Sequence, residues 1–444
     1  MKLIFSIAIS ISLAFGSTAT AAELHQASKK KQLTEWEQIC QPDKKVPAAW
    51  KSYQKFLLAT EFGCDNNFYR YVNYPVVDYK GSASITPKGE LQNIEVCKIK
   101  NITDEYANAF QLYPSRESYS KMNIQILPLE TNDYKSNSTP MKDYGHFFKL
   151  LETWVINNSD FGYTGKISIP DNYLTFNKFL GEYKTIGSHG AENAQFLKDA
   201  MTAVDPIIDF RQTDVVIVLV PPQVDPSLLA TGGGGYRETK DNHDIDRFMV
   251  VSPFNFTNTD RPHVNTSFVS PVILLHQLQH GIYNFGDYID TGGWGIMSLP
   301  TTTDLLGWQK YISGFYGDSQ VRCLPTDKTS FSVLTPSVAK TTKEKLAVIP
   351  ISKTKAIVLE SMRAGGFNYK LPKASEGVLI YEIDTSIPDH SKGITVISNK
   401  RGMATERLMG ATLKKKEFVV TNGFKITLME SGAFGDVVRV EKVS

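Results

Sequence analysis

Apolar and polar positions follow two different periods along the chain, and the change of period divides the sequence. Between residues 121 and 320, short apolar runs alternate with segments whose apolar residues have helical spacing. This pattern predicts strands and helices in alternation: strands at 123–129, 165–170 and 215–220, and helices at 147–156 and 194–208. Strands that alternate with helices are typical of an α/β layer.

From residue 321 onward the apolar runs are shorter, and turn residues separate them at close intervals. Short strands are predicted at 346–351, 356–361, 377–383, 394–397, 418–421, 424–429 and 437–443. This spacing is typical of a β-sandwich or a barrel. We therefore expect an α+β fold, with an α/β domain over 121–320 and a β-sandwich-like C-terminal domain over 321–444.

The region that precedes these two domains has no uniform pattern. Within residues 22–120, the stretch 50–62 has helical spacing, whereas 83–99 alternates like strands around the turn Pro87-Lys88-Gly89. We predict a separate N-terminal region, whose type the pattern does not define.

The first 21 residues have the pattern of a secretory signal peptide. Lys2 gives a positive start, residues 3–15 are apolar, and Ala19-Thr20-Ala21 fits a cleavage site. The apolar stretch is short for a bilayer span of about 20 residues, and no later segment is long and apolar enough for one. We expect the signal peptide to be cleaved and the mature protein to be secreted, periplasmic or extracellular.

Composition narrows the class of protein but not its activity. The 444 residues include 48 Lys and Arg against 46 Asp and Glu, which leaves a formal charge of +2. A nucleic-acid-binding protein needs a concentrated basic field, so we expect no nucleic-acid partner. The hydrophobic fraction of 41% is that of a globular chain. Composition leaves the choice between an enzyme and a binding protein open.

The four cysteines are Cys40, Cys64, Cys97 and Cys323. Disulfides form in exported proteins, and four cysteines allow three connectivities, among which the sequence does not choose. Three of the four fall within residues 22–120, so an internal disulfide there is one expectation. No Cys-x-x-Cys pair is present, which argues against a cysteine zinc site.

The segment 270–298 has the strongest chemical pattern of the chain. Pro271 suits the first turn of a helix, and His276 and His280 lie four residues apart. On a helix these two side chains share one face and are able to bind one metal ion. The other histidines lack ligand spacing and are expected to be surface or structural residues: His146, His189, His243, His263 and His390.

The residues around the two histidines extend this pattern. In His-Glu-x-x-His metallopeptidases, the Glu after the first His is the general base for metal-bound water. Gln277 stands in that place here. A third ligand and then a Met-turn are expected downstream, and Asp287 and the stretch 293–298, which includes Met297, lie where those parts belong.

At these residues the chain resembles the immune inhibitor A-type secreted zinc metallopeptidases, as a divergent member with His-Gln-x-x-His. The similarity continues through segments 304–315, 358–363, 371–372 and 377–384, and covers the chain from about Asn123 to its C-terminus. The resemblance implies a zincin-like core, one zinc ion held by His276, His280 and Asp287, and a polypeptide substrate or ligand.

Three departures from the family pattern bear on activity. Gln277 replaces the catalytic Glu, and a neutral amide does not accept a proton from zinc-bound water. Tyr283 stands where the family has a turn glycine, and Asp287 lies eleven residues after His276 where the family's Asp lies ten after. One extra residue in the turn restores the spacing, and Asp290 then matches the family's later Asp.

The sequence therefore leads to three hypotheses. The first is an exported metallopeptidase homologue that binds zinc but is catalytically impaired at Gln277, and that acts as a binder of a polypeptide or surface ligand. The second is an active secreted zinc endopeptidase in which another acid, such as Asp290, replaces the missing base. The third is a metal-free binding module, in which His276 and His280 merely pack.

Overall fold

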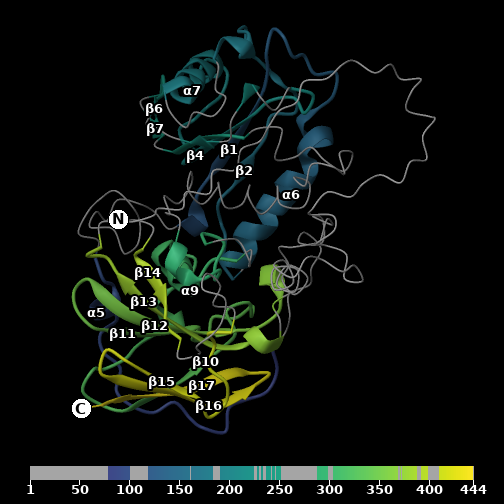
Figure 1. Cartoon of the computed structure of the whole chain (residues 1–444). Helices are drawn as coiled ribbons and strands as arrows, with labels where there is room; N and C mark the ends of the chain where they lie inside the picture. Colours follow the sequence, from purple (N-terminus) through teal and green to yellow (C-terminus); the bar gives the residue numbers. More distant parts are fainter. Residues whose placement is uncertain are drawn as a thin grey trace, which may run out of the picture.

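The computed structural model describes part of the chain: residues 79–100, 119–160, 162–183, 191–224, 228–229, 232–233, 237–241, 243–245, 247–251, 288–298, 304–368, 371, 373–387, 392–398 and 410–443. Within these residues, helices and several sheets are combined (Figure 1). One group of elements forms an α/β layer, and the C-terminal elements form two further sheets. The mixed α+β class expected from the sequence is confirmed.

The α/β layer is built on a mixed sheet with the strand order β2-β1-β4-β8-β5. Strands β2, β1, β4 and β8 are parallel, and β5 runs antiparallel to β8 at the edge. Strand β3 pairs with the far end of β1, and a separate pair is formed by β6 and β7. Their bounds are β1 Ile124–Glu130, β2 Ile167–Ser168, β3 Leu174–Thr175, β4 Val215–Leu219, β5 Gly232–Gly233, β6 Arg237–Glu238, β7 Asp244–Ile245 and β8 Arg247–Val250.

Two helices contribute to different hydrophobic clusters on the two faces of this sheet. Helix α6 (Pro140–Asn158) packs in one cluster with Val215 and Ile217 of β4, whereas α7 (Ala191–Val204) packs in another with Val216 and Val218. Successive strand residues point to opposite faces, so a continuous apolar run serves both helices. Short 3-10 helices at Tyr119–Lys121 (η3) and Leu180–Glu182 (η4) flank these elements.

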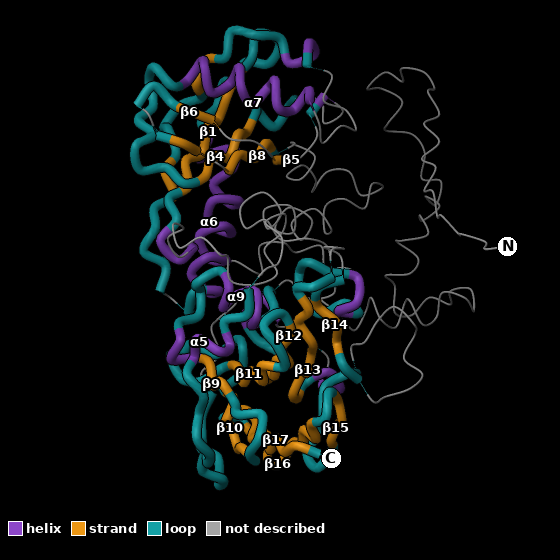
Figure 2. Tube along the Cα trace, turned by 90° about the vertical axis from the view of Figure 1, so that its left-hand side faces the viewer, coloured by secondary structure: helices purple, strands orange, loops and turns teal. Residues whose placement is uncertain are grey.

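The C-terminal sheets pack face to face as a sandwich, as the sequence predicted. One has the order β14-β13-β12-β11-β9, and the other has the order β10-β17-β16-β15 (Figure 2). Apolar side chains of both sheets share one buried cluster. The bounds are β9 Val321–Cys323, β10 Ser330–Leu334, β11 Leu346–Pro350, β12 Lys355–Met362, β13 Gly377–Asp384, β14 Ile394–Val396, β15 Phe418–Thr421, β16 Phe424–Gly432 and β17 Gly435–Lys442.

The second face of the five-stranded sheet joins the α/β layer. Its Val348, Val358 and Tyr381 belong to the same hydrophobic cluster as α6, as do residues of helix α9 (Gly307–Ile312). The remaining short elements of this part are η7 Ile289–Thr291, η8 Asp318–Gln320, η9 Gly366–Asn368 and η10 Lys373–Ser375. One continuous apolar core therefore connects the α/β layer to the sandwich.

Most expected elements are found, but the region 83–99 is not a pair of strands. There, Lys88 forms an isolated bridge with Phe331, and helix α5 occupies Ile94–Cys97. The side chain of Asn93 caps α5 by accepting a hydrogen bond from the backbone N–H of Glu95. The expected helix at 50–62 and the signal peptide at 1–21 lie outside the described residues, and the domain boundaries stay predictions.

The sequence left the cysteine connectivity open, and the structure shows that Cys97 takes no part in an internal disulfide of the N-terminal region. Cys97 is bonded to Cys323 of β9, 226 residues away in sequence. Residues 79–100 thus pack against the sandwich. Sequence spacing did not reveal this pairing because helix α5 and strand β9, which are far apart in sequence, bring the two cysteines together.

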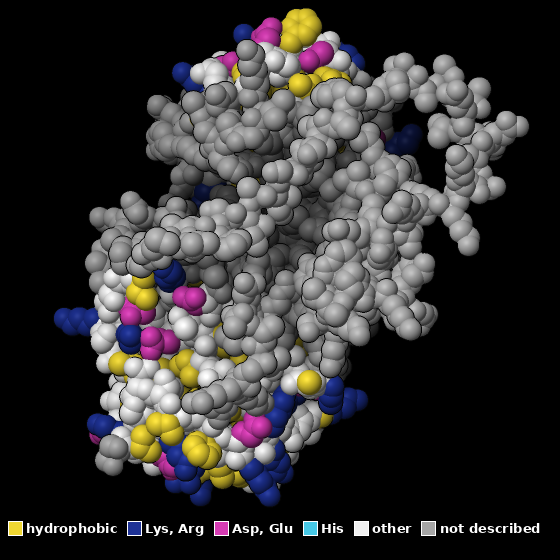
Figure 3. All heavy atoms as spheres, viewed as in Figure 1, with side chains coloured by type: hydrophobic (Ala, Val, Ile, Leu, Met, Phe, Trp, Pro, Cys, Tyr) yellow, Lys and Arg dark blue, Asp and Glu magenta, His cyan; other side chains and the backbone are white. Residues whose placement is uncertain are grey.

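The visible surface carries both signs of charge. On the face shown in Figure 3, Lys and Arg are interspersed with Asp and Glu over the described residues of the sandwich. This distribution agrees with the near-zero net charge and forms no single basic field. Among the described helices, none combines the length and the apolar composition that crossing a membrane requires.

Candidate metal centre and its buried support

The predicted zinc ligands lie outside the described residues. This holds for His276, Gln277, His280 and Asp287, and also for Tyr283. Asp290, the residue weighed as a substitute base, lies in η7 and is exposed. The ligand set and the role of Gln277 therefore stay predictions. The structure describes the segment that directly follows the motif, residues 288–298.

The segment that follows the motif, residues 288–298, is a buried turn. The backbone N–H of Tyr288 donates to the Met297 carbonyl at 2.7 Å, which closes the turn at its base. The N–H of Gly293 donates to the Ser298 hydroxyl at 3.0 Å. Trp294 and Met297 are almost completely buried. The stretch that resembles a Met-turn is thus a compact, internally bonded element of the core.

Gly295 is required both by the conformation of this turn and by its packing. Its φ of +83° lies in the left-handed region that side chains other than glycine rarely adopt. A Cβ at this position would also lie 3.1 Å from Cγ of Leu306. The turn therefore lies close against the residue that precedes α9.

A buried ion pair holds the turn to α9. The Ile296 N–H donates to the Asp304 carbonyl at 2.8 Å. The Asp304 carboxylate in turn accepts a hydrogen bond from Lys310 Nζ at 2.8 Å, with 7% and 2% of the two side chains exposed. Breaking such a pair leaves an uncompensated charge in the core. Asp304 thus fixes the end of the turn relative to the helix.

The start of α9 is held by two residues of the five-stranded sheet. The Gly307 N–H donates to both carboxylate oxygens of Glu360, at 3.2 and 3.1 Å, and the Trp308 N–H donates to the Tyr381 hydroxyl at 3.0 Å. These bonds satisfy N–H groups that a helix leaves unpaired at its first turn. A Cβ at position 307 would lie 2.9 Å from Glu360 and 2.5 Å from Leu346, so any larger residue requires these two buried side chains to move.

These contacts bring together segments that are far apart in sequence. The stretches 288–298, 304–315, 358–363 and 377–384 each contain residues of this network. They are also the segments that carry the family resemblance. The four segments therefore converge on one buried network.

Burial raises the pKa of Glu360 to about 7, even though Gly307, Lys310 and Tyr381 favour its charged form. An unfolded Glu titrates near 4.5. Between these two values the folded chain holds a proton that the unfolded chain has released. We therefore expect the free energy of unfolding to fall as pH rises from about 4.5 to about 7, by an amount on the order of 3 kcal/mol from this group.

Glu360→Gln tests this expectation. The amide keeps an acceptor for the Gly307 N–H and carries no charge at any pH, so the variant should lose the contribution of Glu360 to the pH slope. Urea unfolding at pH 5 and pH 8 measures it, with the exposed Glu90→Gln as a control. Equal pH slopes in the wild type and Glu360→Gln would contradict the assignment.

A second buried ion pair connects α6 to the sandwich. Lys345 Nζ lies 2.6 Å from Asp160 Oδ1, with 0% and 8% of the two side chains exposed. Asp160 comes just after α6, and its other oxygen accepts a hydrogen bond from Gln320. Lys345 also donates to the carbonyls of Ser337 and Ala339. Burial lowers the pKa of Lys345, and the Asp160 carboxylate opposes that shift.

The buried charges of Glu360, Asp160 and Lys345 were not predicted from the sequence. Glu360 stands inside the apolar run Ala356–Met362, where a charged residue is an exception to the pattern. A charged residue inside an apolar strand is rarely buried without a partner, so such an exception indicates a buried, hydrogen-bonded carboxylate. Asp160 and Lys345 gave no comparable signal, because both lie in polar stretches between elements.

One of the remaining histidines has a described ring, and its contact fits the structural role expected for it. His243 Nε2 lies 2.8 Å from the Thr213 carbonyl, to which it donates. Within the described part of the chain, no group of three or more His, Cys, Asp and Glu is placed to hold a metal ion.

Comparison with known proteins does not identify a family. No protein-family description and no curated sequence matches this chain. A crystal structure of wild-type OgpA from Akkermansia muciniphila aligns with 77% of this chain and 97% of that chain, at 10% sequence identity and a TM-score of 0.31. Similarity at this level establishes neither a shared fold nor a shared activity.

Proposed function

We propose that this protein is an exported metallopeptidase homologue that binds one zinc ion through His276, His280 and Asp287. Two imidazoles and a carboxylate, with a fourth position open to water, make a donor set used in catalytic zinc sites. Because Gln277 replaces the general base, catalysis is impaired. The protein then acts as a binder of a polypeptide or of another surface ligand.

The observation that carries this proposal is where the chain enters and leaves the segment 252–287, which contains the histidine motif. The chain leaves β8 at Val251 and returns at Tyr288, and both residues belong to the same buried cluster. β8 is parallel to its neighbour β4, and ligand sites of open α/β sheets lie outside the carboxyl ends of the strands. The segment from 252 to 287 begins at such an end, which supports a site there.

The sheet also offers a place for an extended polypeptide. β5 is the terminal strand of the described sheet and runs antiparallel to β8, the strand that leads into the motif segment. Terminal strands bind extended peptides by adding them as a further strand. A mixed sheet of this kind is compatible with the zincin-like core that the resemblance implies. We propose that the polypeptide ligand lies along β5.

Zinc-dependent proteolysis tests the impairment. The purified exported chain, loaded with zinc, is incubated with an unfolded polypeptide from pH 5 to pH 9. We expect cleavage no faster than that by the His276→Ala variant, because neither protein has a base at position 277. Robust cleavage by the wild type that is lost in His276→Ala would show an active endopeptidase and contradict the proposal.

A further inference from the structure

Residues 79–100 run along one side of the sandwich, and we call them the strap. Figure 1 shows the strap passing under the C-terminal sheets and rising to α5 beside β11. Contacts are made along its whole length: Tyr79 to Ala364, Ser84 to Glu430, Lys88 to Phe331, Gln92 to Cys323 and Leu324, and Lys100 to Lys353 and Thr385.

The strap covers the terminal strand of each sheet. Among the described strands, β10 ends the four-stranded sheet and β9 ends the five-stranded sheet, on the side where the strap runs. The Phe331 N–H of β10 donates to the Lys88 carbonyl at 2.9 Å, and the Gln92 N–H donates to the Cys323 carbonyl of β9 at 3.0 Å. Backbone groups of both edges are thereby paired.

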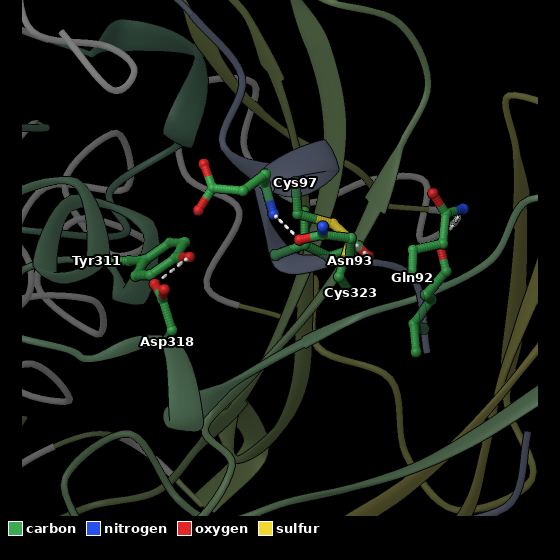
Figure 4. The surroundings of a disulfide bond; sticks show 9 residues. Gln92, Asn93, Cys97, Tyr311, Asp318 and Cys323 are labelled. Carbon is green, nitrogen blue, oxygen red and sulfur yellow. Dashed lines mark hydrogen bonds between the residues drawn. A yellow bond between two sulfur atoms is a disulfide. The ribbon is translucent and has the colours of Figure 1, made fainter. Parts of the chain in front are cut away.

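The disulfide fastens the strap beside the second of these contacts. Cys97 of α5 is bonded to Cys323, and both residues are buried (Figure 4). Cys97 and the nearby Ile99 belong to the large hydrophobic cluster. A crosslink between residues 226 apart keeps the strap at high effective concentration next to its edge, even when its hydrogen bonds open.

We infer that the strap is an edge guard of the sandwich, which blocks β9 and β10 from pairing with another copy of this chain, and that the disulfide holds it in place. An uncovered terminal strand is a template for strand pairing between molecules. The strap fills that position with a segment of the same chain. This inference is independent of the zinc site.

Gly89 provides a way to loosen the strap at β10. Its φ is +108°, and a Cβ would lie 3.3–3.4 Å from atoms of Ser330 and Thr329, beside the Lys88 contact. Gly89→Val therefore introduces both backbone strain and a close contact at the covered edge. Gly81→Val is the matched control, because Gly81 has a φ of +100° and a Cβ there has nothing within 4 Å.

The experiment compares the full chain with three variants: Gly89→Val, Gly81→Val, and Gly89→Val combined with Cys97→Ser and Cys323→Ser. Hydrogen exchange of the Phe331 amide measures whether the strap still protects β10. Light scattering over a concentration series measures self-association. We expect exchange at least ten times faster in Gly89→Val, unchanged exchange in Gly81→Val, and concentration-dependent oligomers in the combined variant.

Three results would overturn the inference. The first is Phe331 protection in Gly89→Val equal to that of the wild type. The second is an equal loss of protection in Gly81→Val, which would make strain rather than edge contact the cause. The third is faster exchange without self-association in the combined variant. If that variant does not fold, Cys97→Ser combined with Cys323→Ser at an unchanged Gly89 replaces it, and faster Phe331 exchange without self-association again overturns the inference.

Discussion

Gln277→Glu is expected to increase zinc-dependent proteolysis by about 10²–10⁴-fold, the usual contribution of a general base. The substitution keeps the size and shape of the side chain and adds a group that accepts a proton. The buried turn at 288–298 directly follows the motif and is unchanged by this substitution. Cleavage of an unfolded polypeptide by the zinc-loaded variant measures the gain.

Gln279→Glu is the matched control for this prediction. It makes the same chemical change two residues further along the motif, away from the position of the base. It should leave activity at the wild-type level, and adding His280→Ala to Gln277→Glu should abolish the gain. A zinc-loaded Gln277→Glu protein with wild-type activity would contradict the view that the missing base limits catalysis.

Lys345→Met is expected to destabilise the fold by about 3–5 kcal/mol, the typical effect of removing one partner of a buried ion pair. The methionine fills a similar volume but leaves the Asp160 carboxylate in the core without its cation. Among the described residues, the Gln320 amide then remains as a hydrogen-bond donor to it. Thermal and urea unfolding of the wild type and the variant measure the loss.

The double variant Asp160→Asn with Lys345→Met separates the charge from the packing. Asn tolerates the positive φ of 48° at this position and still accepts a hydrogen bond from Gln320. With both charges removed, we expect the double variant to be more stable than Lys345→Met alone. A Lys345→Met protein within 1 kcal/mol of the wild type would show that the pair does not hold α6 to the sandwich.

Much of the fold follows from the sequence because its strands have clear periods. The buried run 215–220 and the sandwich strands near 346–351 and 377–383 were found from apolar patterning alone, and the structure confirms them. The pattern failed at 83–99, because the strap meets the two sheet edges through backbone groups of Lys88 and Gln92 and leaves Leu91 and Val96 exposed. Such contacts depend on residues more than 200 positions away.

Of the candidate site, too, the sequence predicts one part and not another. The spacing of His276 and His280 predicts two metal ligands on one helix face, and the family resemblance adds Asp287 as the third predicted ligand. The sequence does not predict the buried network after the motif, in which Asp304 pairs with Lys310 and Glu360 of a distant strand holds the Gly307 N–H. Their partners are set by tertiary packing, which no local pattern contains.

Zinc content of the purified protein tests the central claim most directly. After dialysis against metal-free buffer, inductively coupled plasma mass spectrometry should find close to one zinc ion per chain in the wild type and in Gln277→Glu. His276→Ala and His280→Ala should each lose it, because a site with three protein ligands does not hold zinc tightly with two. A wild-type protein without zinc, or zinc retained after both histidines are replaced, would contradict the account.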